Sequence, residues 1–204
     1  MYTLDAYKTT DRNKIDQFIE NNGFADLVTL QDGSLCSNKV PLYYDKSTNE
    51  LFGHFGRDNP QLKSLNDSND VLVIFSGAHA YISPQWYESD NGVPTWNFQT
   101  LQIRGKASIV DGKSLLAILA KLTKFYESTL PKQWTMSQLD PVKRKKMTDM
   151  ITGFKIKISD IKFKEKMSQL RSVGDQKSVV NALNDQGRPF AKKVAKIMKC
   201  NLED

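Results

Sequence analysis

Hydrophobic positions near the N-terminus recur at helical spacing. Residues three and four positions apart share one face of a helix, and the apolar residues that do so are Ile15, Phe18 and Ile19. Thr10 can accept a hydrogen bond from the first unpaired amides, and Gly23 can end the helix. The pattern therefore predicts a helix from Asp11 to about Asn22.

After Gly23 the apolar residues take the alternating or continuous spacing that is typical of strands. Polar stretches with turn chemistry separate these segments. The expected strands span residues 25–30, 34–44, 51–55, 71–75, 80–83, 98–110 and 154–161. Gly77 is expected to separate two of them, and Gly105 to mark a bulge or bend. Successive antiparallel hairpins are the simplest topology for this order.

Helical signals return at several places. Asn59 can cap a short helix that continues to about Leu65, with Pro60 at the first position, where a missing amide costs nothing. The other expected helices span residues 113–126, 141–150, 175–184 and 189–200, and Gly187 separates the last two. Strands with inserted and appended helices predict an α+β domain built round a small, mostly antiparallel β-barrel.

Length and composition fit a globular protein. The 204 residues suit one domain, or one domain with an appendage. The longest apolar run, residues 71–75, is far shorter than the roughly 20 residues of a membrane-spanning helix, and the N-terminus does not read as a signal peptide. Cys36 and Cys200 lack the spacing of a zinc site or a disulfide framework. We therefore expect a cytoplasmic protein with no membrane partner.

Charge is distributed unevenly along the chain. Residues 1–139 carry a net charge of −2 and residues 140–204 carry +8, so the whole basic excess lies in the last third. Segregated positive charge can bind DNA or another polyanion. It is also typical of a solvated, lysine-rich face on ordinary surface helices. The sequence leaves both interpretations open.

The segment GHFGRDNPQ, residues 53–61, is the first with candidate chemistry. A strand there runs directly into a helix start, where unpaired backbone amides favour an anion. Arg57 adds a fixed charge that suits phosphate. In the alternative interpretation Asn59 is a plain helix cap and Arg57 an ordinary surface charge.

Residues 77–87 and 93–98 form the second such region, because they concentrate aromatic side chains. The aromatic residues are His79, Tyr81, Trp86, Tyr87, Trp96 and Phe98, and the short polar residues among them are Ser83, Thr95 and Asn97. Such rings can enclose a flat heterocycle while polar groups fix its edges. They can also form an aromatic layer of the core, or stack on bases.

The common nucleotide, hydrolase and zinc motifs are missing. The chain has no GxGxxG, GxxxxGK[ST], GxSxG or HExxH. Its two histidines, His54 and His79, have no obvious serine or cysteine nucleophile beside them, so the sequence does not indicate triad catalysis. We assign no catalytic residue and no metal ligand.

Four motifs in order resemble the PaiB family, described as FMN-binding negative transcriptional regulators. The motifs are GHFGRDNPQ, VLVIFSGAHAYISPQWY, VPTWNF and KEKMSQ, and the resemblance spans roughly residues 1–185. It implies a split β-barrel of the flavin-binding type, with FMN as cofactor and a homodimer that forms FMN sites at its interface. We expect residues 1–170 to form this flavin-binding domain and residues 171–204 to be a basic helical extension packed on it.

The resemblance also implies roles for individual residues. Arg57, Asp58 and Asn59 would hold the FMN phosphate, and Asn38 and His54 would belong to the same cofactor site. The residues expected to contact the isoalloxazine and ribityl parts, from the same or the partner subunit, are Tyr81, Ser83, Trp86, Thr95, Trp96 and Asn97. The residues expected to close the site are Lys166, Ser168 and Gln169.

Three functions fit these features. The first is a flavin-binding negative transcriptional regulator that contacts DNA through the basic C-terminal third. The alternative is a flavin-dependent oxidoreductase related to pyridoxamine phosphate oxidase, acting on an unknown small molecule, in which His54, His79 or Tyr81 could donate a proton. The third is a cofactor-free dimeric barrel that binds a partner protein through its basic helices.

Overall fold

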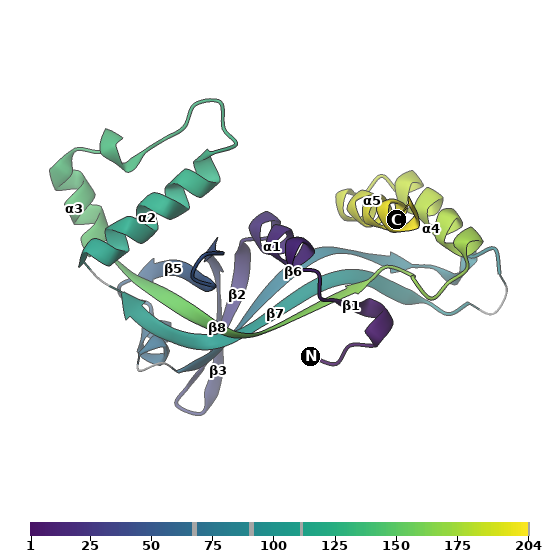
Figure 1. The fold of residues 1–204 in the computed structure, drawn as a ribbon, viewed down its shortest axis with the longest axis horizontal. Coiled ribbons are helices and arrows are strands. Elements are labelled where there is room, and N and C mark those ends of the chain that lie inside the picture. The colour runs from purple at the N-terminus through teal and green to yellow at the C-terminus, as the bar shows by residue number, and fades with distance from the viewer. Residues whose placement is uncertain (67–68, 90–91, 111, 204) are drawn as a thin grey trace. The chain divides into compact units, whose positions relative to one another are not determined.

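The structure, a computed structural model, describes residues 1–66, 69–89, 92–110 and 112–203 (Figure 1). The strands are β1 (Lys8–Thr9), β2 (Phe24–Gln31), β3 (Ser34–Pro41), β4 (Tyr43–Asp45), β5 (Glu50–Gly56), β6 (Asp70–Ile82), β7 (Thr95–Val110) and β8 (Ile151–Lys166). The α-helices are α1 (Arg12–Asn21), α2 (Gly112–Glu127), α3 (Pro141–Asp149), α4 (Val173–Asp185) and α5 (Pro189–Glu203). Short 3-10 helices are η1 (Asp5–Tyr7), η2 (Pro60–Leu65), η3 (Pro84–Trp86) and η4 (Met136–Gln138).

Within the described residues the strands form one sheet, in the order β3-β2-β6-β7-β8-β5-β4, with β1 also paired to β8. The strand pairs of known register are antiparallel, such as β2 with β3 and β5 with β8. The prediction of an α+β fold with a mostly antiparallel sheet is therefore confirmed. Among the helices that the structure describes, none has the length and apolar composition needed to cross a membrane.

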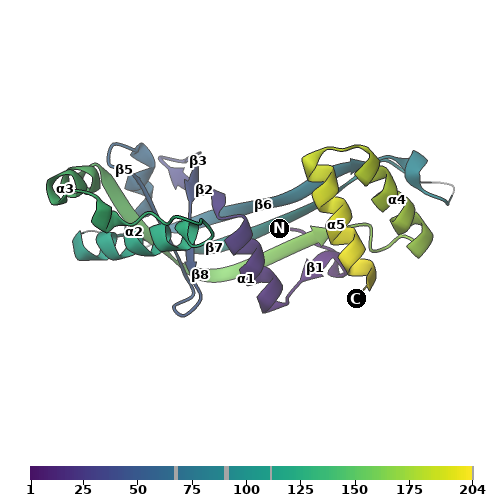
Figure 2. The same ribbon diagram turned by 90° about the horizontal axis from the view of Figure 1, so that it is seen from above.

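The chain forms two compact units, and β6, β7 and β8 each contribute residues to both. The first unit comprises residues 1–15, 76–101 and 162–204, and the second comprises residues 16–75 and 102–161. Figure 2 shows α4 and α5, which belong to the first unit, and α2 and α3, which belong to the second. The expected domain boundary at residue 170 stays a prediction.

The first unit has a small core between the strand ends and the C-terminal helices. One side is formed by Ala80 and Ile82 of β6, and the other by buried residues of α4 and α5. The helix residues are Val179, Leu183, Ala191, Val194, Ala195 and Met198. Successive side chains of β6 point to opposite faces of the sheet. Ala80 and Ile82 are therefore buried against the helices, while His79 and Tyr81 are exposed.

The second unit contains the larger strand assembly. Leu27, Val73 and Ile103 are fully buried in it, as is Phe154 on β8. Helix α2 packs on this unit through Leu115, Ile118 and Leu122, the buried residues of its apolar face.

Several element boundaries differ from prediction. Thr10 is not the cap of α1, because the Asp11 carboxylate accepts from the amide of Asn13 at 2.8 Å and so takes the capping role. Residues 34–44 are two strands rather than one, with a break at Leu42, whose amide donates to the Gly23 carbonyl oxygen. The break allows β3 to pair with β2 while β4 pairs with β5.

The two strand glycines have different outcomes. Gly77 does not divide residues 70–82, because it is buried inside the continuous strand β6. Gly105 lies within β7, and its role as a bulge or bend stays a prediction. A Cβ atom there would lie 2.5 Å from the carbonyl oxygen of Lys157, so glycine permits close approach of β7 and β8.

Candidate functional site

The end of β5 and the start of η2 form the first candidate site, in the second unit. The amide of Arg57 donates to the carbonyl oxygen of Met150 at 2.8 Å, which ties the end of β5 to the residue after α3. The side chain of Asn59 accepts from the amide of Gln61 at 2.9 Å, so Asn59 caps η2 as predicted. Asp58 lies exposed between them. Because η2 is a six-residue 3-10 helix, the charge of Arg57 is the stronger attraction for an anion here.

Gln61 is a residue of this site that the sequence analysis missed. It is fully buried, and its amide nitrogen donates to the Leu27 carbonyl oxygen at 2.8 Å and to the Thr29 hydroxyl at 3.2 Å. Its amide oxygen accepts from Asn38 at 2.9 Å. Gln61 therefore fixes the predicted site residue Asn38 relative to the Asn59 cap. The only signal in the sequence is its place after the capping residues, because its side-chain partners lie on β2 and β3.

His54 is half-buried on β5, opposite Gly153 of β8. Its Nδ1 atom is buried and has no hydrogen-bond partner in the described part of the chain. Burial lowers the pKa of His54 below its ordinary value of 6.5, because water no longer solvates the charged ring. At neutral pH the ring is therefore neutral, so one nitrogen carries a hydrogen and the other a lone pair.

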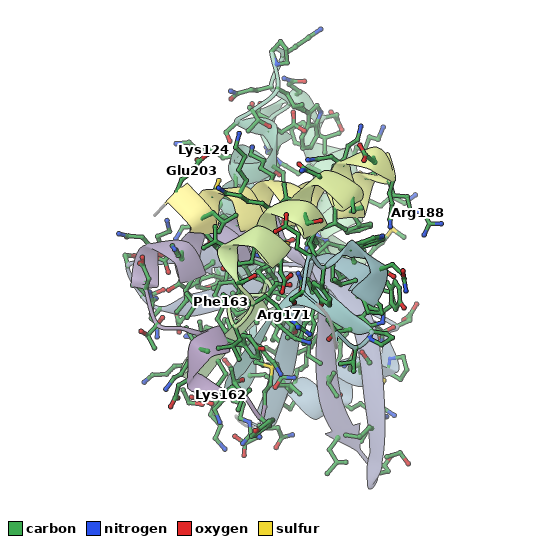
Figure 3. The ribbon with its side chains drawn as sticks, turned by 90° about the vertical axis from the view of Figure 1, so that its right-hand side faces the viewer. Lys124, Lys162, Phe163, Arg171, Arg188 and Glu203 are labelled. Carbon is green, nitrogen blue, oxygen red and sulfur yellow. The ribbon has the colours of Figure 1, made fainter. Side chains whose placement is uncertain are left out.

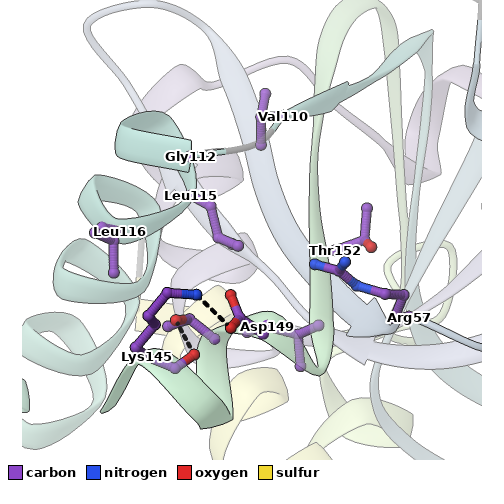
Figure 4. A pocket seen from close by; sticks show the side chains of 10 residues that line it. Arg57, Val110, Gly112, Leu115, Leu116, Lys145, Asp149 and Thr152 are labelled. Carbon is purple, nitrogen blue, oxygen red and sulfur yellow. Dashed lines mark hydrogen bonds and ion pairs between the residues drawn. The ribbon is translucent and has the colours of Figure 1, made fainter. Parts of the chain in front are cut away.

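The Arg57 side chain is exposed and lines a cavity of about 250 Å³ (Figure 4). Its guanidinium lies toward Thr152 in that view. Across residues 1–66, 69–89, 92–110 and 112–203, no carboxylate forms an ion pair with Arg57. An arginine with no acidic partner can anchor an anionic ligand.

The second candidate site is an exposed aromatic cluster in the first unit. The rings of Tyr81 on β6 and Trp96 on β7 meet edge to face at 6.0 Å. His79 lies 6.3 Å from Trp96 and stacks on Phe190 of α5 at 4.6 Å. Trp96 is 52% exposed and Tyr81 43% exposed. We call these four residues the aromatic face. Phe190 was not predicted as a site residue, because the sequence indicates only its position in a helix.

Two predicted cofactor residues lie in the interior of the first unit. Asn97 is fully buried and Ser168 nearly so. The Asn97 amide donates to the Ser168 hydroxyl at 2.9 Å and contacts the Met198 sulfur at 3.3 Å. Ser168 adopts a positive φ of 62°. Through Asn97, these contacts join β7 to the turn after β8 and to α5, so both side chains are engaged within the protein.

The other predicted residues of the first unit hold turns or pack against the core. Ser83 caps η3 by accepting from Gln85, and Trp86 packs against the core beneath α4 and α5. Gln169 closes the turn after β8 by donating to the Glu165 carbonyl oxygen at 2.7 Å. Lys166 donates to Thr95, and the pKa of Lys166 is lowered, first by burial and then by the nearby charge of Lys164.

The two sites suit different parts of a flavin nucleotide. Arg57 offers a guanidinium without an acidic partner, which suits a phosphate. Tyr81 and Trp96 offer exposed ring surface, which suits stacking against a flat heterocycle. His54 adds a buried ring nitrogen without a partner among the described residues. The residues present therefore fit FMN, which supplies redox chemistry when it is bound.

Comparisons with solved structures show where this fold occurs. The flavocytochrome Anf3 from Azotobacter vinelandii superposes with a TM-score of 0.62 at 14% identity, covering 78% of this chain and 69% of that one. The FAD and heme binding protein from Mycobacterium smegmatis gives a TM-score of 0.60 at 13% identity, covering 78% and 73%. At such identity the likeness shows the fold alone, and it confirms the predicted split barrel.

Comparisons of sequence give the family. Residues 1–160 match the family described as "Putative FMN-binding domain". The chain is 35% identical over 205 residues to protease synthase and sporulation protein PAI 2 of Bacillus subtilis, covering 100% of this chain and 99% of that protein. The chain therefore belongs to the PaiB family of FMN-binding proteins, as its four motifs predicted.

Proposed function

We propose that this protein binds FMN by its phosphate at Arg57 and acts as a homodimeric negative regulator of transcription. The observation that carries the binding proposal is the exposed guanidinium at the end of β5, which has no acidic partner in the described residues. Asn59 and the buried Gln61 hold the backbone beside it in a fixed conformation. A fixed backbone next to a free cation favours a phosphate group.

The test is a titration of the apoprotein with FMN, followed by flavin fluorescence and visible absorbance. The Arg57→Gln variant removes the cation, and Arg104→Gln removes another exposed arginine of the same unit as a control. We expect Arg57→Gln to weaken FMN binding by about 10-fold to 100-fold, the effect of losing a charge-assisted hydrogen bond, while Arg104→Gln leaves it unchanged. Equal affinity in all three proteins would contradict the phosphate site.

The aromatic face supports the homodimer. An exposed tryptophan, tyrosine and phenylalanine on one face are the residue types that interfaces favour. In this proposal Tyr81 and Trp96 of one copy stack against FMN held by the other copy. Sedimentation velocity tests it: we expect a dimer for the wild-type chain and a shift toward monomer for Trp96→Ser, whereas a wild-type monomer at micromolar concentration with FMN bound would contradict it.

The regulatory role is supported by a relative's name and by charge. The Bacillus subtilis relative is named for protease synthase and sporulation, which is consistent with control of gene expression. The exposed basic residues of α5 are Lys192, Lys193, Lys196 and Lys199. Arg188, just before α5, points away from the ribbon in Figure 3. A helix with many exposed cations can contact DNA phosphates.

A second candidate function is flavin-dependent oxidoreduction, and His54 is the observation that favours it. A neutral, half-buried imidazole three residues before Arg57 can transfer a proton during reduction of a bound substrate. The discriminating measurement is the rate at which NADH or NADPH reduces the FMN-loaded protein. Reduction faster than that of free FMN, lost in His54→Phe, would favour the enzyme; a rate equal to that of free FMN would favour the regulator.

A further inference from the structure

The cavity beside Arg57 lies wholly within the second unit, among the start of α2, α3 and the first residues of β8 (Figure 4). Its volume is about 250 Å³, which is below the roughly 300–1,000 Å³ of pockets for drug-sized ligands. The lining residues are Arg57, Val110, Gly112, Leu115, Leu116, Lys145, Thr148, Asp149, Ile151 and Thr152. None of them lies on the aromatic face.

One wall of the cavity is apolar. It is formed by Val110 of β7, Leu115 and Leu116 of α2 and Ile151 of β8. Leu115 is buried, while Leu116 is 42% exposed at the surface. A wall of branched aliphatic side chains favours an apolar group, because burial there removes apolar surface from water on both sides.

The polar part of the cavity carries one net positive charge. Lys145 and Asp149 form an ion pair at 2.6 Å along α3, so their charges largely offset each other. The Arg57 guanidinium, near Thr152 in Figure 4, has no such partner among the described residues. A single anionic group on a ligand would balance it. The Asp149 carboxylate disfavours a second negative charge in the same space.

We propose that this cavity binds a small monocarboxylate with an apolar body, its carboxylate held by the Arg57 guanidinium and its apolar part against the wall of Leu115, Leu116 and Ile151. A planar guanidinium binds a carboxylate through two parallel hydrogen bonds. An inorganic phosphate dianion satisfies the cation but leaves the aliphatic wall in contact with water. A neutral apolar molecule covers the wall but leaves the cation without a counterion.

The ligand has a consequence for the cofactor, and this step rests on the proposed function. If Arg57 also anchors the FMN phosphate, the phosphate and the carboxylate ligand bind to the same guanidinium. The carboxylate then competes with FMN, so the concentration of a small apolar acid sets the fraction of protein that carries flavin. The cavity would thus give the protein a sensor for such acids.

The test uses benzoate as the probe and the full-length apoprotein, with methyl resonances of Val110, Leu115, Leu116 and Ile151 followed by NMR. Benzoate titrated to about 20 mM covers the millimolar affinities expected of so small a ligand. We expect saturable shifts of these methyl groups. Arg57→Gln should weaken binding at least tenfold, and Leu116→Trp should abolish it by filling the cavity. The matched controls, Arg104→Gln and Leu35→Trp, change exposed residues elsewhere in the unit and should bind as wild type.

Any of three results would overturn the proposal. They are the absence of saturable methyl shifts in a folded protein, an unchanged affinity of Arg57→Gln for benzoate, and binding of the neutral analogue benzyl alcohol with the same affinity as benzoate. Inorganic phosphate that shifts the same resonances more strongly than benzoate would show a simple anion site instead.

Titration of FMN in the presence of benzoate separates this inference from the proposed function. We expect benzoate to raise the apparent dissociation constant of FMN in the wild-type protein and in the control Leu35→Trp, and the neutral benzyl alcohol to leave it unchanged in both. If FMN fails to bind while benzoate gives the expected shifts, the proposed function fails and the carboxylate site stands. If FMN binds and benzoate does not, the reverse holds.

Discussion

At the scale of single residues, Gln61 decides the geometry of the β5–η2 site. Its fully buried amide bonds to β2, to Asn38 on β3 and, through the backbone, to the Asn59 cap. A glutamine that satisfies several buried groups at once cannot be replaced by an apolar residue of similar size without leaving those groups unpaired. Sequence alone could not show this role, because the side-chain partners come from two other strands.

We therefore expect Gln61→Leu to lower the free energy of unfolding by about 1–3 kcal/mol, the cost of buried polar groups left without partners. Urea denaturation measures it. Gln138→Leu, at an exposed position of η4, is the control and should change stability by less than about 0.5 kcal/mol. Equal stability of the two variants would show that water replaces the Gln61 side chain.

Asp45 provides a second test at this scale. Lys121 and Ser47 bond to its carboxylate and lower the pKa of Asp45 from 3.8 to about 2. The pair therefore adds stability that is present above about pH 4 and is lost as the pH falls toward 2. Because Lys121 is half-exposed, we expect about 1 kcal/mol. Asp45→Asn should be less stable than wild type at pH 6 and should lose this difference by pH 2; a difference that is independent of pH would contradict the pairing.

At the scale of elements, the close approach of β7 and β8 depends on Gly105. A Cβ atom at this position would lie 2.5 Å from the Lys157 carbonyl oxygen and 2.6 Å from the Ile156 side chain. Gly105→Ala must therefore push the two strands apart, and we expect a loss of about 1–3 kcal/mol in thermal or urea unfolding. Gly56→Ala, where a Cβ meets no atom within 4 Å, is the control. Little or no loss for Gly105→Ala would show that the strands can shift at low cost.

The helices and strands differ in how closely their bounds could be predicted from the sequence. Helix α2 was predicted to within one residue at each end, because Leu115, Leu119 and Leu122 repeat at helical spacing. Strand β8 was predicted only over residues 154–161, because Gly153 interrupts the pattern at its first end and residues 162–166 are mostly charged. The choice between Thr10 and Asp11 as the cap of α1 depends on backbone geometry that composition does not contain.

At the scale of the whole molecule, the basic residues concentrated in the last third of the chain are the ones that would contact DNA in the proposed regulatory role. Helix α5 presents its lysines to solvent, while Val194 and Met198 lie in the core. If this helix contacts DNA, each phosphate contact adds about 0.9 to the slope of log affinity against log salt. Replacing Lys192, Lys193 and Lys196 with Gln should then weaken binding and reduce that slope by up to about 2.7.

Fluorescence anisotropy of labelled duplex DNA at several salt concentrations makes this measurement. The control variant neutralises three exposed lysines elsewhere, Lys63, Lys113 and Lys132. An equal effect of both triple variants would reveal a response to net charge alone. The absence of binding by the wild-type protein even at low salt would end the regulatory proposal and leave the oxidoreductase.

The candidate site was predictable from sequence only in part. The motifs located both candidate segments, and the capping role of Asn59 followed from local chemistry. The structure brings together Asn38 and Asn59 through Gln61, and Tyr81 with Trp96, but it buries Asn97 and Ser168 beneath α5. Alternation predicts that neighbouring strand residues face opposite sides, yet which side is covered by helices depends on contacts between distant parts of the chain.

The most direct measurement is an experimental structure of the protein in complex with FMN. We expect the phosphate oxygens within hydrogen-bond distance of the Arg57 guanidinium, next to the Asn59 cap, and the isoalloxazine ring in contact with Trp96 or Tyr81 of a second copy. A phosphate bound by other residues, with Arg57 still directed into its cavity, would contradict the proposed site and assign the guanidinium to the carboxylate ligand alone.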